Sequence, residues 1–359
     1  MVKDIGIDLG TANILIYLQD RGIVLNEPSL VAINEKTQEV IAVGAKAYQM
    51  LGRTPKDVTV VHPLKGGVIA DIAVTEQMLE HFINRLNLHS YFRKPNILIC
   101  TPTNITSVEQ KSIIQAAIKC GGNMIYLEEE PKVAAVGTGL DVFSPVGSMV
   151  IDIGGGTSDI AVLSMGSTVT SRSIKLAGDD MDREIMNYMK EEYQLLIGER
   201  TAEEIKMNLG TAIKLEQESD MHVRGRDMAT GLPKNVEIFS NEIYECLKEI
   251  LQQICEEARL VLEQTPPELS GDIIERGVMV TGGGALIYGI ERLIGEYLQV
   301  PVFVAEEPLA SVAHGTGLLL ARIREQQPPF SFLSRLFNPK RVIEHPTANM
   351  IDETTAERS

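Results

Sequence analysis

The feature that most constrains the fold is a pair of glycine turns, each of which follows an aspartate at the end of a run of strand-forming residues. The later turn, in VIDIGGGTSDIAVL, places three glycines between Asp152 and Asp159. The earlier one, in DIGIDLGTANILIYL, has Asp8 two residues before Gly10. Aligned on Asp8 and Asp152, the segments IDLGTAN and IDIGGGTSD are two versions of one sequence motif, which indicates an internal duplication.

These turns predict a site for phosphate and a divalent cation. A turn dense in glycine exposes successive backbone N–H groups, which bind anions. Carboxylates alone would repel phosphate, but with a cation present Asp8 and Asp152 can hold Mg²⁺, through its water ligands. A third cluster, TGGGA at 281–285, follows the strand-like GVMVT and precedes a helical pattern. It lacks the Lys-Ser/Thr of a Walker A loop and the spacing of a dinucleotide fold. Together the three loops predict a nucleotide held between two domains.

Composition narrows the class of protein. The chain has 359 residues, 44% of them hydrophobic, and a net charge of -16. Its length favours two globular domains, and its acidity argues against a nucleic-acid partner. The four cysteines form no close C-x-x-C pair, so neither a zinc site nor a disulfide framework is indicated, and we expect a reducing cytoplasm. Because no signal peptide or long uncharged apolar stretch is seen, we expect a protein that is not exported and does not span a membrane.

Strand-like and helix-like segments alternate along the chain, which predicts an α/β fold. Strands are expected at 4–18, 29–33 and 96–100, and a capping box from Thr106 to Glu109 is expected to open a helix. A long helix is predicted over 240–264. It is expected to end there, because Pro266 and Pro267 follow. Thr201 and Glu204 are expected to form a second capping box. The turn SPVGSM at 144–149 marks the main domain boundary.

The motifs resemble those of a known superfamily. IDLGTAN, DIGGGTSD and TGGGA, in this order and spacing, resemble the two phosphate motifs and the adenosine motif of the actin, sugar kinase and heat-shock chaperone ATPases. GIVLNEPSLVAI, HPLKGGVIAD, LEEEPKVAAVGTGL and GDDMD are similar to segments of the bacterial actin homologue MreB and its paralogues such as Mbl. The similarity runs from about residue 4 to about residue 324.

The resemblance implies an actin-like ATPase fold, in which duplicated RNase H-like domains of four subdomains in all surround a nucleotide cleft. The first half is then 1–146, with an insertion at about 29–70. The second is 147–324, with an insertion at about 180–240 and a last part that returns to the first half. Residues 325–359 are expected to form a C-terminal tail, with a possible amphipathic membrane-binding segment followed by disorder.

The resemblance also implies a set of ligand-binding residues for ATP and Mg²⁺. Asp8 and Asp152 would organise the Mg²⁺. Phosphate contacts are expected from two loops, namely Gly10, Thr11, Ala12, Asn13, Gly154, Gly155, Gly156 and Thr157. Asn13 stands where actin has a lysine. The adenosine is expected against the third loop, namely Gly282, Gly283, Gly284 and Ala285, with Glu203 and Lys206 reaching its base or ribose. An ion pair on a helix surface is the alternative for Glu203 and Lys206, because they are three residues apart.

Catalysis requires a group that orients water toward the γ-phosphate. The resemblance assigns this role to Glu130, with Thr157 as a relay for the displaced proton. Pro131 can occupy the first position of a helix, which would place Glu130 near a helix N-terminus. The alternative is that the three glutamates at 128–130 are solvated or cap the helix.

Three functions share this fold. A small-molecule kinase would need an acceptor pocket, and the zinc-binding Cys/His signature of one kinase branch is absent. A chaperone would need a β-rich peptide-binding domain, whereas about 35 residues follow position 324. We therefore expect a slow ATPase that polymerises into filaments and helps determine cell shape by organising cell-wall synthesis or cell architecture. The resemblance implies that its protofilaments pair. Its expected partners are itself, an anionic membrane surface and cell-shape or cell-wall proteins.

The tail segment PPFSFLSRLFNPKR predicts membrane contact. A helix here would gather five apolar side chains on one face, namely Phe330, Phe332, Leu333, Leu336 and Phe337. Residues 322–341 carry five basic side chains and one acidic one, which favours anionic lipid. Tyr91 and Phe92 in LHSYFRKPN form a second candidate, and packing of the tail on its own domain or on a partner is the alternative. A membrane role would place the protein in the cytoplasm, at the inner face of the cell membrane.

Overall fold

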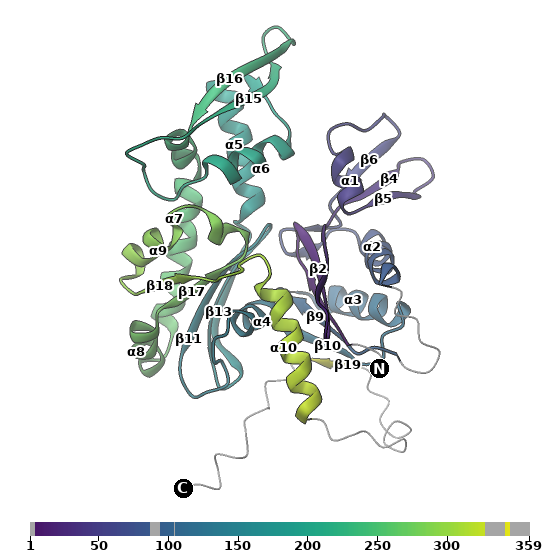
Figure 1. The fold of residues 1–359 in the computed structure, drawn as a ribbon, viewed down its shortest axis with the longest axis vertical. Coiled ribbons are helices and arrows are strands. Elements are labelled where there is room, and N and C mark those ends of the chain that lie inside the picture. Colours follow the sequence, from purple (N-terminus) through teal and green to yellow (C-terminus); the bar gives the residue numbers. More distant parts are fainter. Residues whose placement is uncertain (1–3, 87–93, 104, 327–341, 345–359) are drawn as a thin grey trace.

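Two α/β halves stand on either side of a cleft that residues of both halves line. Two helices lie between the halves below this cleft (Figure 1). The computed structural model describes residues 4–86, 94–103, 105–326 and 342–344. Each half is built on one large sheet, and each carries a smaller α/β unit at the upper end in the figure.

The first half contains a six-stranded sheet in the order β19-β10-β9-β1-β2-β3. Its strands are β1 (Ile5–Leu9), β2 (Asn13–Leu18), β3 (Gly22–Pro28), β9 (Ile97–Thr101), β10 (Ile125–Glu129) and β19 (Val342–Glu344). One face is covered by α2 (Ile72–Arg85) and α3 (Ser107–Lys119), and the other by α4 (Glu130–Gly137) and α10 (Ser311–Gln326). The sheet is thus buried on both faces, as its continuous apolar strands require.

The second half repeats this topology. Its sheet has the order β13-β12-β11-β17-β18, which matches β3-β2-β1-β9-β10, with the same antiparallel and parallel pairings. Its strands are β11 (Ser148–Ile153), β12 (Ser158–Ser164), β13 (Ser167–Ile174), β17 (Val278–Thr281) and β18 (Val302–Val304). The helices are α7 (Ser240–Gln264), α8 (Pro267–Arg276) and α9 (Ile290–Leu298). The shared strand order confirms the duplication that the two aspartate turns predict.

Each half carries one insertion. In the first, β4 (Val31–Asn34), β5 (Val40–Val43) and β6 (Val58–Val61) form a sheet beside α1 (Ala45–Met50). In the second, β14 (Leu195–Leu196), β15 (Asp220–Asp227) and β16 (Pro233–Phe239) accompany α5 (Gly178–Glu192) and α6 (Glu199–Leu209). The hairpin of β7 (Leu64–Lys65) and β8 (Val68–Ile69) leads from the first insertion back toward the cleft.

Helix α10 follows β18 of the second half but packs on α4, β1 and β2 of the first half. The contact with α4 is unusually close, because a Cβ atom on Gly137 would collide with the Ser311 carbonyl oxygen and one on Gly315 with that of Val133. Glycine is therefore required at both positions, since any side chain would force the helices apart. This crossing joins the two halves at the base of the cleft.

Helix starts follow their predicted signals in one case and not in another. Thr106 and Glu109 form the expected capping box, with Glu109 Oε2 accepting a hydrogen bond from the Thr106 amide at 2.9 Å. The capping box predicted for Thr201 and Glu204 is wrong. Helix α6 begins earlier, after Gly198, and Glu204 pairs instead with the Arg200 side chain at 3.4 Å.

The C-terminal tail contributes one strand to the first half. Residues 342–344 pair in parallel with β10, so the disorder predicted for the end of the tail is wrong for these residues. The membrane candidates Phe330, Phe332, Leu333, Leu336, Phe337, Tyr91 and Phe92 lie outside the described residues. Within the described ranges, no helix combines the length and apolar character needed to cross a membrane.

Candidate nucleotide-binding site

The two aspartate turns meet at the floor of the cleft. Gly155 lies against Ala12, and a Cβ atom on Gly156 would be 2.7 Å from Thr11 Oγ1. The later turn is closed by a hydrogen bond from the Gly154 amide to the Thr157 carbonyl oxygen at 2.9 Å. The missing side chains thus allow turns from opposite halves to touch, which leaves their backbones facing one cavity.

That cavity has a volume of about 400 Å³ and lies between the halves. It is lined by nearly all the residues predicted to bind nucleotide or metal, namely Asp8, Gly10, Thr11, Ala12, Asn13, Glu130, Asp152, Gly154, Gly155, Gly156, Thr157, Glu203, Lys206, Gly282, Gly283 and Gly284. Ala285 is the exception: the structure buries it, with 4% of its surface exposed, away from the cavity. Its side chain belongs to the core of the second half, and its contact with adenosine stays a prediction.

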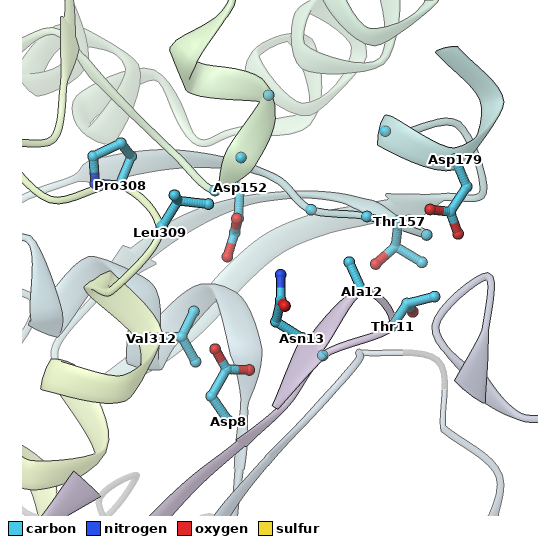
Figure 2. A pocket seen from close by; sticks show the side chains of 18 of the residues that line it. Asp8, Thr11, Ala12, Asn13, Asp152, Thr157, Asp179, Pro308, Leu309 and Val312 are labelled. Atoms are coloured by element: carbon cyan, nitrogen blue, oxygen red, sulfur yellow. The ribbon is translucent and has the colours of Figure 1, made fainter. Parts of the chain in front are cut away.

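The carboxylates of Asp8 and Asp152 point toward one another from opposite halves, with the Asn13 amide beside them (Figure 2). Burial raises the pKa of Asp8 to about 7. Burial, followed by repulsion from Asp159 and Asp8, also raises the pKa of Asp152 well above its usual range. Asp152 Oδ2 is buried without a hydrogen-bond partner. An orphaned carboxylate oxygen in this position fits a bound cation, which would offset the repulsion.

The consecutive glutamates at 128–130 have three different environments. Glu128 is fully buried and lies 3.2 Å from the Lys132 ammonium. Glu129 accepts a hydrogen bond from the Thr168 hydroxyl at 2.6 Å. Glu130 is the first residue of α4 and lines the cavity, where burial and the charges of Asp159, Asp152 and Asp8 raise its pKa. The alternative that all three are solvated or cap the helix is therefore wrong.

Thr157 connects the phosphate turn to a second buried carboxylate. Burial raises the pKa of Asp159, and the neighbouring side chains of Ser173 and Thr157 oppose that shift. Asp159 stands opposite Asp152 in the β11–β12 register, and its Oδ1 is buried without a partner. Thr157 thus lies beside a buried carboxylate that could accept a proton.

Glu203 and Lys206 lie on one face of α6, and each pairs with a different element. Glu203 Oε2 accepts a hydrogen bond from the Tyr48 hydroxyl at 2.8 Å. Lys206 Nζ lies 2.8 Å from Asp182 Oδ2 and donates to the Gly178 carbonyl oxygen at 3.0 Å. Both line the cavity, so a simple ion pair between them on the helix surface is not what the structure shows.

The third glycine loop packs directly on the second aspartate strand. Gly282 has φ 80°, and a Cβ atom there would collide with Asp152 Oδ1. The loop continues as a 3₁₀ turn, η1 (Gly283–Leu286), and α9 begins only at Ile290. The helix expected directly after the glycines is thus displaced, and backbone rather than a helix N-terminus faces the cavity.

Several lining residues escape prediction from sequence. Asp179 and Asp182 line the cavity from the start of α5. The signal that could have identified them is the acidic segment GDDMDRE in which they occur. The Asp179 amide donates to the Gly155 carbonyl oxygen at 2.7 Å. The apolar wall had no such signal and is made by Met207, Leu286, Ile287, Pro308, Leu309 and Val312. Figure 2 shows Leu309 and Val312 on the side of the cavity away from Thr157.

Comparisons with known proteins agree with this geometry. The family model described as MreB/Mbl protein matches residues 2–328. The cell shape-determining protein Mbl of Bacillus cereus is 59% identical over 321 residues, which cover 89% of this chain and 96% of that protein. The cell shape-determining protein MreB of Escherichia coli is 48% identical over 326 residues, which cover 89% and 94%.

A solved structure is similar over nearly its whole length. The crystal structure of MreB 5 of Spiroplasma citri bound to AMPPNP matches with a TM-score of 0.86 and 40% identity, over 90% of this chain and 97% of that one. Sequence and fold therefore lead to the same assignment. This chain belongs to the MreB/Mbl family and has its actin-like fold.

Proposed function

We propose that this chain is a cell-shape-determining cytoskeletal ATPase, which binds Mg-ATP in the cleft, hydrolyses it slowly and polymerises into membrane-associated filaments. The observation that carries the proposal is the meeting of two Asp-Gly turns from opposite halves around an unpartnered oxygen of Asp152. The nucleotide in the MreB 5 structure and the names of the Mbl and MreB relatives support it.

Different parts of the chain bind the phosphates, the cation and the adenosine. The backbone N–H groups of the two turns receive the phosphates, and Asp8 and Asp152 hold Mg²⁺, which neutralises phosphate charge when bound. The third glycine loop and the apolar wall receive the adenosine, with Glu203 and Lys206 at its edge. This division follows the order of the chain, because the third glycine loop runs directly into the apolar lining residues Leu286 and Ile287, whereas Asp8 and Asp152 precede the two phosphate turns.

Hydrolysis is assigned to Glu130 with help from Thr157. Glu130 is held at the first position of α4 and faces the same cavity as the phosphate turns. It orients the attacking water, and the Thr157 hydroxyl, which neighbours Asp159, passes on the displaced proton. Because phosphoryl transfer depends mainly on positioning, one carboxylate in a rigid frame is sufficient for a slow rate.

Assembly involves the outer surfaces of both halves. We propose longitudinal contacts through the insertions, pairing of protofilaments, and association with an anionic membrane through the apolar residues of the tail or of the Tyr91 and Phe92 segment. Cell-shape or cell-wall proteins would then be organised along the filament at the inner face of the membrane. The small-molecule kinase alternative receives no support from the Mbl and MreB relatives.

Phosphate release and nucleotide binding measured on matched variants test the catalytic assignment. Glu130→Gln is expected to bind Mg-ATP normally but to release phosphate at least about tenfold more slowly, since it loses the group that orients water. Glu129→Gln is the control, because the neighbouring carboxylate bonds to Thr168 and does not line the cavity. Equal rates for Glu130→Gln and the wild type would show that Glu130 is not catalytic.

Sedimentation and electron microscopy with Mg-ATP test assembly. Straight, unbranched filaments are expected with nucleotide. A chain that hydrolysed ATP yet stayed monomeric across nucleotide states, magnesium concentrations and lipid surfaces would contradict the cytoskeletal proposal and favour the kinase.

A further inference from the structure

Three side-chain contacts join the halves at the mouth of the cleft, far from the α4–α10 crossing. The Tyr48 hydroxyl of α1 donates to Glu203 of α6 at 2.8 Å. The Arg200 guanidinium lies over the Tyr48 ring, 5.5 Å from its centroid. His62 Nε2 lies 3.5 Å from Glu199 Oε2. Helices α1 and α6 stand on opposite sides of the upper opening in Figure 1, and Tyr48 takes part in two of the three contacts.

The first half holds Tyr48 in place. Ala47, the preceding residue of α1, is fully buried in the small core of the first insertion. Glu27 of β3 accepts a hydrogen bond from the Ala45 amide at 2.7 Å and pairs with Arg85 of α2 at 2.8 Å. Helix α1 is thus attached to the main body of its half, so the position of the Tyr48 hydroxyl reports the position of that half.

Helix α6 is fixed to the second half by packing in its core. One face of it is buried in the main core, through Ala202, Ile205 and Leu209. The adjacent face carries Glu199, Glu203 and Lys206 at spacings of four and three residues, which place them in one stripe. This stripe runs from the mouth of the cleft, at Glu199, to the cavity that Glu203 and Lys206 line.

Tyr48 and Glu203 differ in their relation to the cavity. Glu203 lines it, whereas Tyr48 lies outside the lining and touches the site through Glu203. The carboxylate therefore has one oxygen engaged by the opposite half while the side chain borders the space assigned to the nucleoside. The position of the Glu203 side chain therefore depends both on what occupies the cavity and on the distance between α1 and α6.

We propose that Tyr48 is a positioning residue for nucleotide retention: its hydroxyl fixes Glu203 beside the nucleoside and ties α1 to α6, and this bond must break before the nucleotide leaves. The inference rests on the proposed function and adds to it the residue that sets the release rate. It concerns release rather than hydrolysis, because Tyr48 does not border the phosphate turns.

The strengths of the three contacts decide which one matters most. A hydrogen bond to a carboxylate is stronger than one between neutral groups. Burial and the neighbouring Glu203 raise the pKa of Tyr48 to about 12, which keeps the phenol protonated as a donor. The His62 and Glu199 side chains are exposed, so their pair contributes little. Loss of the Tyr48 hydroxyl is therefore expected to speed release by about three- to tenfold.

A displacement experiment on the full chain measures this rate directly. Protein is loaded with ATP bearing an N-methylanthraniloyl fluorophore on the ribose and Mg²⁺, and then mixed with excess unlabelled ATP in a stopped-flow instrument. Tyr48→Phe keeps the ring and its contact with Arg200 but removes the donor. Tyr193→Phe is the matched control, because Tyr193 also donates to a glutamate, Glu242, at 2.6 Å, away from the cavity.

Faster release by Tyr48→Phe with an unchanged rate for Tyr193→Phe is the expected result. Glu203→Ala should also release faster, and adding Tyr48→Phe to it should have no further effect, since Tyr48 acts through Glu203. A wild-type rate in Tyr48→Phe, or an undiminished effect of that change in the Glu203→Ala background, would overturn the assignment alone. A wild type that failed to bind the labelled nucleotide would overturn the proposed function together with this inference.

Discussion

Gly155 and Ala12 lie so close together that a Cβ atom added to Gly155 would be 2.6 Å from the Cβ of Ala12. The two residues belong to different halves of the chain, more than a hundred positions apart. Their contact sets how near the phosphate turns can come, and so determines the width of the cavity floor.

Gly155→Ala should therefore weaken nucleotide binding by at least about tenfold, because overpacking at this contact moves the turns apart. Isothermal titration with Mg-ATP measures the loss. Gly271→Ala introduces the same methyl group in α8, where nothing lies within 4 Å, and should leave affinity unchanged. Comparable affinities for Gly155→Ala and Gly271→Ala would show that the turns can separate without loss of binding.

The buried pair of Glu128 and Lys132 should respond to single and double changes differently. The side chains are 0% and 3% exposed. Lys132→Met removes the ammonium that faces the Glu128 carboxylate, and should reduce the free energy of unfolding by roughly 3–5 kcal/mol. Glu128→Gln in the same chain should restore at least half of that loss, because the side chain that faced the Lys132 ammonium is then neutral. Chemical denaturation checks both, and a double variant less stable than Lys132→Met would contradict the explanation.

Asp182 should give a measurable pH dependence in the nucleotide-free protein. Burial raises the pKa of Asp182 to about 6, with Lys206 opposing the shift. The folded state then binds more protons than the unfolded state, so this stabilisation is complete below the unfolded pKa near 4 and is lost as pH rises through 6. Asp182→Asn lacks this titration, and its stability relative to the wild type should rise by about 2 kcal/mol between pH 4 and 7. A difference that stayed constant with pH would contradict this prediction.

The membrane prediction concerns the tail sequence itself. Changing Phe332 and Leu336 to Ser should greatly reduce co-sedimentation with anionic vesicles, because it removes apolar surface from the predicted helix face. ATP hydrolysis should remain as in the wild type. Undiminished binding to vesicles would move the contact to the Tyr91 and Phe92 segment or to another surface.

Sequence patterns predict those parts of this molecule that depend on local physics. Helix α7 occupies 240–264 as predicted, because its apolar stripe is continuous and Pro266 stops it. The glycine turns are predictable for the same reason, since a phosphate nest needs glycines at neighbouring positions. The false capping box at Thr201 shows the limit, because Thr and Glu at the right spacing also occur inside a helix whose start is set by Gly198.

The remaining parts of the site depend on contacts distant in the sequence. Leu309 and Val312 line the cavity only because the chain leaves β18 and returns to the first half as α10. Tyr48 reaches Glu203 across 155 positions, and neither residue carries a local signal of the other. Ala285 is next to three lining glycines yet is buried in the core of the second half, which depends on packing against residues distant in the sequence.

If the cleft opens, we expect the two halves to rotate relative to each other about the crossing of α4 and α10. Backbone meets backbone there at Gly137 and Gly315, so no side chain at these two positions separates the helices. The mouth of the cleft lies at the far end of both halves. A small rotation about the crossing would therefore produce a large displacement between Tyr48 and Glu203. Glu130 begins α4, so a rotation that opened the mouth would also change the direction of the carboxylate to which we assign hydrolysis.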